Sequence, residues 1–296
     1  MELCVNNTIS GSATNFKEIS NSENLIKYLT DTNRRLERTE YIHHYTKLDS
    51  ILNIIRNEYW ILKNPLQMND QNEIEHWSRE RWKQIYFISF MKEQKESVGM
   101  WSMYAQPWET GVKVSITKQA IKNWIKSIDK IYYANPENYT VDESEFVAVG
   151  TNRKQILLSA VAYTNYEDKN KEPECLECGT TAKNKRLRNI YKNSNLIGYI
   201  KNNAWSYEKE MRLRVELEKP YPAVALKLTD DLISGITITK GPRFEGDLEA
   251  TIKRKLQKSI KTDKSLFFQK ISNISCDHCN YKEHIKYEKE KDYVNL

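Results

Sequence analysis

Long hydrophobic runs are missing from this sequence of 296 residues. No stretch approaches the roughly 18 consecutive apolar residues that a helix needs to span a bilayer. The N-terminal residues also lack the basic segment followed by an apolar run that marks a secretory signal. We therefore expect a cytoplasmic protein without a transmembrane helix. The reducing surroundings would keep its cysteines free or metal-bound rather than paired.

The sequence also has little excess charge and no internal repeat. Its 46 basic and 40 acidic residues give a net charge of +6, and the two signs are interspersed along most of the chain. This pattern permits contact with nucleic acid but lacks the concentrated basic stripe of a dedicated nucleic-acid binder. Aromatic residues make up 11% of the chain, too many for a mainly disordered protein. We expect a folded protein with a substantial core.

The most informative stretch is WSYEKEMRLRVEL at residues 205–217, in which apolar residues alternate with charged ones. A period of two over this length predicts a β-strand with one face in the core. The other face would carry Glu208, Glu210 and Arg212. A helix is the alternative, because Glu208 and Arg212 also have the i,i+4 spacing of helical ion pairs. The sustained alternation favours the strand. The simplest interpretation of its charges is a set of ion pairs on a half-exposed strand.

The rest of the chain mixes helical and strand-like patterns, which predicts an α+β protein with a mixed β-sheet, continuous or split, and flanking helices. We expect a leader with one helix at residues 1–40, a core domain at 41–272 with an insertion at 166–186, and a polar tail at 273–296. The predicted strands of the core cover residues 41–49, 60–64, 85–91, 111–117, 146–149, 156–163, 205–217, 223–228, 235–240 and 266–271. The predicted helices that follow the leader cover residues 48–55, 76–84, 99–106, 118–131, 188–203 and 247–261.

Four groups of polar or aromatic residues are candidates for chemistry. They are the HHYT segment at residues 43–46, the NDQNE segment at 69–73, Trp101 with Tyr104, and Glu208/Glu210 with Arg212. Each group alone has an ordinary structural explanation. A histidine pair after a strand is more often structural than catalytic, closely spaced aromatics usually pack in a core, and NDQNE has the composition of a turn.

The order of these motifs is more specific than any one of them. HYT followed by a helix, NDxxE, IxFISF, MWSxYA, GVxV and WSYExExRL together resemble a widespread bacterial family of domains of unknown function. The resemblance extends over about residues 41–242. It implies little about biochemistry.

A fainter resemblance is to ADP-ribosyltransferase-like enzymes, which include bacterial toxins. It implies a split sheet that holds NAD in a central cleft, with transfer of ADP-ribose to DNA, RNA or protein and a role as a toxin or phage-defence effector. His44 would bind the nicotinamide ribose, with Tyr45 and Thr46 beside it. Tyr104, or Trp101 in its place, would stack on nicotinamide. Glu210 or Glu208 would be the catalytic carboxylate.

The residue types suit this chemistry, because breaking the nicotinamide glycosidic bond develops positive charge on the ribose. A fixed carboxylate stabilises that charge most in the transition state. Arg212 can hold Glu210 in place or pair with the pyrophosphate of NAD, and Asn69 can orient a ribose or the acceptor. The Ser-Thr-Ser triplet of one toxin subclass is missing, and Ser89 is a partial substitute. The pattern does not decide between Glu208 and Glu210.

Two CxxC pairs predict a structural zinc site. Cys175 and Cys178 lie in the insertion, and Cys276 and Cys279 lie in the tail. This spacing lets both thiolates of a pair reach one tetrahedral Zn²⁺. About 100 residues separate the pairs, so the fold must bring them together, and four ordinary reduced cysteines are the alternative. The rival functions are a nucleic-acid-binding or nuclease module without NAD chemistry and a non-catalytic interaction domain.

Overall fold

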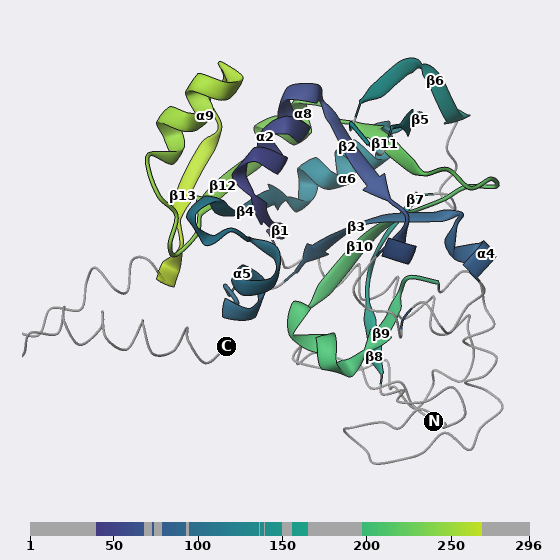
Figure 1. Cartoon of the computed structure of the whole chain (residues 1–296), viewed down its shortest axis with the longest axis horizontal. Coiled ribbons are helices and arrows are strands. Elements are labelled where there is room, and N and C mark those ends of the chain that lie inside the picture. Colours follow the sequence, from purple (N-terminus) through teal and green to yellow (C-terminus); the bar gives the residue numbers. More distant parts are fainter. Residues whose placement is uncertain are drawn as a thin grey trace, which may run out of the picture. The chain divides into compact units, whose positions relative to one another are not determined.

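The structure is a computed structural model that describes residues 40–67, 73, 79–92, 95–135, 137–138, 140–149, 156–164 and 197–267. These residues form a mixed α+β protein (Figure 1), which confirms the predicted fold class. The ADP-ribosyltransferase-like split of the sheet stays a prediction. The strands are β1 (Tyr41–Lys47), β2 (Tyr59–Lys63), β3 (Ile85–Met91), β4 (Gly111–Thr117), β5 (Lys130–Ala134), β6 (Val141–Val149), β7 (Ile156–Ala160), β8 (Ala162–Thr164), β9 (Ile200–Asn202), β10 (Glu210–Glu216), β11 (Ala223–Lys227), β12 (Ile236–Lys240) and β13 (Lys261–Lys264).

Short helices connect these strands. The α-helices are α2 (Leu48–Asn57), α4 (Arg79–Trp82), α5 (Val98–Tyr104), α6 (Lys118–Ser127), α8 (Asp230–Ser234) and α9 (Leu248–Leu256). The 3-10 helices are η3 (Pro65–Gln67), η4 (Trp108–Thr110) and η6 (Asn203–Glu208). Thr117 and Asp247 accept hydrogen bonds from the backbone N–H groups of Ala120 and Ala250, and thereby cap the N-termini of α6 and α9.

The chain divides into two compact units. Unit 1 contains the residues up to His44, Asn53–Lys95 and Ser115–Ile236. Unit 2 contains Tyr45–Leu52, Glu96–Val114 and the residues from Thr237 onward. In unit 1 the neighbouring strands are β1-β3-β10-β7 in one sheet and β2-β11-β5-β6 in another. In unit 2, β12 pairs in parallel with β13.

Strand β10 lies inside the sheet of unit 1. It pairs antiparallel with β3 on one side and with β7 on the other, and all of its residues except Glu216 are buried. The simplest interpretation of its charges, as ion pairs on a half-exposed strand, is therefore wrong. The strand also begins at Glu210 rather than Trp205, because the preceding residues form η6. The charges of β10 lie in the protein interior.

Several other boundaries differ from the predictions. The helix predicted at 118–131 ends at Ser127, because the next residues form β5 and pair with β11 and β6. Of the helix predicted at 188–203, residues 188–196 lie outside the described residues, and residues 200–202 form the strand β9. Residues 261–264 form the last described strand, before the segment predicted to be a strand at 266–271. The leader to residue 39, the insertion at 166–186 and the tail at 273–296 lie outside the described residues.

No helix in the described ranges combines the length and the apolar character needed to cross a bilayer.

Candidate functional site

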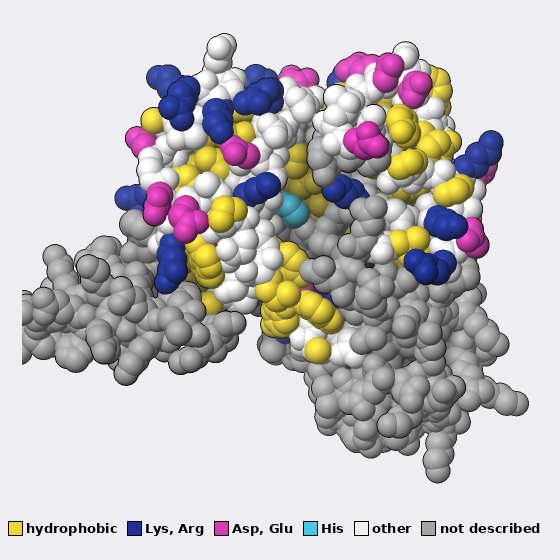
Figure 2. Space-filling model, in the orientation of Figure 1, with side chains coloured by type: hydrophobic (Ala, Val, Ile, Leu, Met, Phe, Trp, Pro, Cys, Tyr) yellow, Lys and Arg dark blue, Asp and Glu magenta, His cyan; other side chains and the backbone are white. Residues whose placement is uncertain are grey.

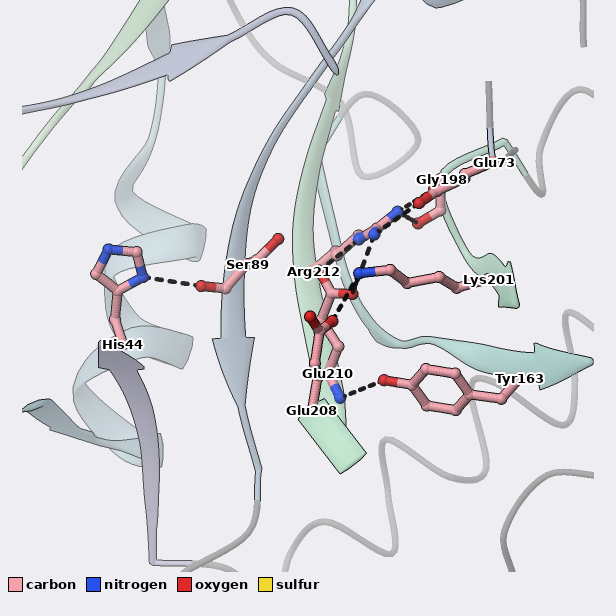
Figure 3. A network of polar contacts seen from close by, with 9 residues as sticks. All are labelled: His44, Glu73, Ser89, Tyr163, Gly198, Lys201, Glu208, Glu210 and Arg212. Atoms are coloured by element: carbon pink, nitrogen blue, oxygen red, sulfur yellow. Dashed lines mark hydrogen bonds and ion pairs between the residues drawn. The ribbon is translucent and has the colours of Figure 1, made fainter. Parts of the chain in front are cut away.

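A buried group of charged side chains surrounds Arg212 in the middle of β10 (Figure 3). The Arg212 Nε and Nη2 donate to the two carboxylate oxygens of Glu210 at 2.6 and 3.0 Å. The Nη1 and Nη2 also donate to the two carboxylate oxygens of Glu73, the second at 3.0 Å. The Nη1 further donates to the carbonyl oxygen of Gly198 at 2.8 Å. These contacts use all five N–H groups of the guanidinium.

The neighbouring strands provide the space for this guanidinium. The residues directly opposite Arg212 are Ser89 on β3 and Ser159 on β7, both of which have small side chains. The ring of Phe87 lies under the guanidinium, with its centroid 4.3 Å from Cζ, and forms a cation–π contact. Gly198 has a positive φ of 81°, a conformation that side chains rarely adopt. The small side chains of Ser89 and Ser159 thus leave room for a large buried cation.

A second cation joins the same group. The Lys201 Nζ on β9 donates to Glu208 Oε2 at 2.6 Å and to Glu210 Oε2 at 3.4 Å. The residue between these glutamates, Lys209, has left-handed backbone dihedrals (φ 44°, ψ 47°) where η6 ends and β10 begins. The backbone N–H of Glu210 donates to the hydroxyl of Tyr163 at 2.8 Å. We call Glu73, Lys201, Glu208, Glu210 and Arg212 the carboxylate cluster.

The pKa values of two carboxyls in the carboxylate cluster shift in opposite directions. Burial raises the pKa of Glu210, but Arg212 and Lys201 together outweigh burial and hold that pKa at about 2. Burial raises the pKa of Glu73 above its usual value despite the contact with Arg212, and the nearby Glu210 adds to this rise. Of these two carboxyls, Glu73 is therefore the one whose environment favours the protonated form.

Both cations of the cluster are held in the charged form. Burial lowers the pKa of Arg212, but Glu210 and Glu73 raise it well above its usual value. Burial likewise lowers the pKa of Lys201, and Glu210 is the main group that raises it above the ordinary range. The attraction between the buried opposite charges therefore offsets the cost of removing these cations from water.

Three of the predicted site residues thus lie together, namely Glu208, Glu210 and Arg212. Of the two roles predicted for Arg212, holding Glu210 is the one that the geometry favours. With five N–H groups already bonded to protein oxygens, Arg212 would have to break a contact to bind a pyrophosphate.

Ser89 on β3 makes hydrogen bonds both to the carboxylate cluster and to His44. A hydrogen bond from the Ser89 side chain contributes to the low pKa of Glu210. On the other side of β3, the backbone carbonyl of Ser89 accepts a hydrogen bond from the His44 Nδ1 at 2.9 Å (Figure 3). Burial lowers the pKa of His44, so the ring is neutral with its proton on Nδ1 and its Nε2 as an acceptor. The rings of Trp60 and Phe90 pack against it.

The other predicted binding residues of the described chain lie in unit 2. Trp101 is buried, packs edge to face against Tyr45 at 4.8 Å and donates its indole N–H to Glu96 at 3.2 Å. It is a core residue of that unit. Tyr104 is exposed over 38% of its surface, and Thr46 is half-buried.

Some predicted ligands lie outside the described residues. These are Asn69 of the NDQNE segment and the four cysteines of the CxxC pairs, Cys175, Cys178, Cys276 and Cys279. Among the residues that the structure does describe, no group of three or more His, Cys, Asp or Glu side chains is arranged to hold a metal ion. The zinc site stays a prediction.

Sequence reasoning missed three members of this site. The NDxxE motif pointed to Glu73 without giving it a partner, and its ion pair with Arg212 spans 139 residues of sequence. Lys201 and Tyr163 had no sequence pattern that distinguished them. Tyr163 lies on β8 and Lys201 lies on β9. These two short strands are parallel, and the two residues are paired in their register.

Unit 2 has a buried carboxylate of its own at Glu96. It accepts hydrogen bonds from Trp101 Nε1, from Lys113 Nζ at 3.0 Å, from the Ser265 hydroxyl at 2.5 Å and from the backbone N–H of Leu266 at 3.3 Å. Burial raises the pKa of Glu96, but the hydrogen bond from Ser265 and the charge of Lys113 outweigh it and lower the pKa below 4.5. The ionised carboxylate therefore joins α5, β4 and the residues that follow β13.

Replacing Glu96 with glutamine is expected to lower the free energy of unfolding at pH 7 by about 1–3 kcal/mol, because buried donors lose a charged acceptor. A lowered pKa in the folded state stabilises the protein above the unfolded pKa, and this contribution is lost as the pH falls below about 4.5. Urea unfolding between pH 7 and pH 3 should therefore show the difference between the variant and the wild type shrinking in acid. Glu109→Gln, at an exposed position, is the control, and a pH-independent difference for Glu96→Gln would contradict this account.

Comparison with known proteins gives a limited result. No curated protein and no solved structure matches the chain significantly. The MWSMYA, GVKV and WSYEKEMRL motifs lie in the matched part of a family model, and the HYT and NDxxE motifs precede it. Residues 100–213 match the family described as Protein of unknown function (DUF2971), which confirms over that part the resemblance to a family of domains of unknown function.

Proposed function

We propose that this protein cleaves NAD between nicotinamide and ribose and transfers the ADP-ribose to a macromolecule. The observation that supports the proposal is a pair of glutamates, Glu208 and Glu210, held by Lys201 and Arg212 in one buried cluster. A carboxylate that is fixed in place and kept ionised stabilises a positive charge that develops on a substrate. The resemblance to ADP-ribosyltransferases supplies the substrate class.

In the proposed reaction the bond between ribose C1′ and the nicotinamide nitrogen breaks, and its electron pair leaves with nicotinamide. The ribose becomes oxocarbenium-like, and a nucleophilic atom of the acceptor then bonds to C1′ and loses its proton. Glu208, which is buried and accepts a hydrogen bond from Lys201, is the carboxylate proposed to act on the ribose. Glu210 is proposed as a positioning residue, because both of its oxygens are held by Arg212.

His44 is proposed to accept a hydrogen bond from a ribose hydroxyl through Nε2. The contact between Nδ1 and the Ser89 carbonyl fixes the tautomer that this role needs, and the lowered pKa keeps the ring neutral. Tyr104 is exposed and Trp101 is buried in unit 2, and a role of either residue in stacking on nicotinamide stays a prediction from the sequence. Structural zinc at the CxxC pairs and a cytoplasmic location remain parts of the proposal that rest on the sequence.

The proposal is tested by calorimetric titration of the full chain with NAD, followed by incubation with NAD labelled in its adenylate half. Binding at or below millimolar concentration, and transfer of the label to protein, DNA or RNA, are the expected results. Absence of NAD binding at millimolar concentration would refute the proposal. Tight, steeply salt-dependent binding of nucleic acid without NAD turnover would favour the rival function instead.

A further inference from the structure

Strand β6 is an outer strand with an unusual surface. It pairs with β5 along one edge, and no other described strand pairs with it in the sheet β2-β11-β5-β6. Five consecutive residues, 142–146, are exposed. Phe146 and Val149 expose 51% and 57% of their surfaces, which places them among the most exposed large hydrophobic residues of the described chain. Figure 2 shows hydrophobic and acidic side chains next to each other over this segment.

Proteins usually protect such an edge from other chains. Charged side chains, lysine above all, proline, short length and β-bulges are the common means. This strand is nine residues long and contains neither lysine nor proline, but it has three carboxylates and two register shifts in its pairing with β5. These carboxylates repel acidic chains and attract basic ones, and the exposed Phe146 and Val149 offer apolar surface that a basic strand can bury.

The charge of the strand indicates what can pair with it. Its sequence, VDESEFVAV, has three carboxylates and no basic residue, in a chain whose net charge is +6. Lys227 of β11 pairs with Glu143 at 3.0 Å, and Lys130 of β5 lies over the Phe146 ring at 5.6 Å. Both lysines belong to strands of the same sheet as β6.

Three kinds of occupant can be compared on this basis. A second copy of β6 would place carboxylates opposite carboxylates, which is destabilising. Nucleic acid would bring phosphates to the same acidic residues and would be repelled. A polypeptide with alternating basic and apolar residues satisfies the charges, covers Phe146 and Val149, and bonds to the backbone of the edge.

We propose that β6 is a docking site for an extended, basic polypeptide segment, which adds to the sheet as a further strand. Main-chain hydrogen bonds supply the affinity, and Asp142, Glu145 and Phe146 select the side chains of the partner. This inference does not depend on NAD chemistry, because it rests on β6 and its neighbours alone.

The test uses a fluorescently labelled nine-residue peptide of alternating lysine and valine, and measures its binding to the full chain by fluorescence anisotropy. Saturable binding that weakens as salt increases is the expected result. The same peptide with alternate residues N-methylated should bind at least about tenfold more weakly, because its N–H groups cannot pair with the edge. A glutamate–valine peptide should not bind.

Two variants locate the site. Phe146→Ala and Glu145→Lys should each weaken binding by at least about tenfold, the first through lost apolar contact and the second through charge. Both positions are exposed, so the circular dichroism and the urea midpoint should stay as in the wild type. Leu157→Ala on β7, at another exposed hydrophobic residue, is the control and should bind normally.

Several outcomes would overturn the proposal. These are no binding of the lysine–valine peptide, equal binding of the N-methylated or the acidic peptide, and unchanged affinity in both β6 variants. Dimer formation that Phe146→Ala abolishes would show that the occupant is a second copy of this chain. Competition by single-stranded DNA that Glu145→Lys strengthens would show that the surface takes nucleic acid.

Discussion

Arg212→Met is expected to lower the free energy of unfolding by about 3–5 kcal/mol, the usual cost of removing one partner from a buried ion pair. Two carboxylates, Glu73 and Glu210, lose their bidentate partner in the interior, and the carbonyl of Gly198 loses a donor. Urea unfolding followed by circular dichroism measures the effect. Arg212→Lys should also be destabilising, because an ammonium has three donors where the guanidinium uses five.

The matched control is Arg254→Met on the exposed side of α9, which should change the free energy of unfolding by no more than about 0.5 kcal/mol. A triple variant that combines Arg212→Met with Glu73→Gln and Glu210→Gln should recover part of the loss, since no unpaired charge remains buried. If Arg212→Met unfolds with the wild-type midpoint and slope, the carboxylate cluster does not have the energetic role described here.

The second large effect is on catalysis. Glu208→Gln is expected to slow nicotinamide release from NAD by about 10²–10³-fold, the range found when one group that stabilises transition-state charge is removed. The change keeps the size of the side chain and removes its charge beside Lys201. The loss should appear in kcat more than in KM, because the carboxylate acts on charge that develops only in the transition state.

Glu210→Gln separates the two glutamates. As a positioning residue held by Arg212, Glu210 should affect both stability and rate. Glu208→Gln should leave the urea midpoint closer to that of the wild type. Lys227→Gln, at a surface ion pair on β11, is the control and should leave the rate unchanged. A Glu208→Gln protein with full activity would exclude Glu208 as the catalytic carboxylate.

The amino-acid pattern predicted most strands of the fold, because each carries alternating or continuous apolar residues bounded by turns. The strands at residues 85–91, 111–117, 223–227 and 236–240 lie within or close to the predicted ranges. Residues 205–208 are an instructive failure. Their alternation of apolar and polar residues continues that of β10, yet they form the 3-10 helix η6. The left-handed backbone conformation of Lys209 ends η6, and β10 begins at the next residue. A single backbone conformation of this kind has no signature in side-chain periodicity.

The candidate site was predictable in part for a related reason. Glu208, Glu210 and Arg212 are close in sequence, so their proximity follows from local structure. Glu73 and Lys201 reach the same place through tertiary pairing, which one sequence does not reveal. The interpretation of β10 as a half-exposed strand was wrong because its charged side chains are buried, where Arg212 pairs with Glu73 and Glu210. The small side chains of Ser89 and Ser159 lie opposite Arg212 on the neighbouring strands. The small residues Ser89 and Ser159 on the neighbouring strands were the feature of the sequence that indicated room for a buried charged side chain.

The most direct test of the central claim is the release of nicotinamide from NAD by the purified full-length chain at pH 7, measured by chromatography with Glu208→Gln in parallel. The carboxylate cluster as an NAD-cleaving site predicts enzyme-dependent release by the wild type and at least about a hundredfold less by Glu208→Gln. No release above the buffer blank, with or without protein and nucleic-acid acceptors, would contradict the claim and leave the cluster as a structural feature of β10.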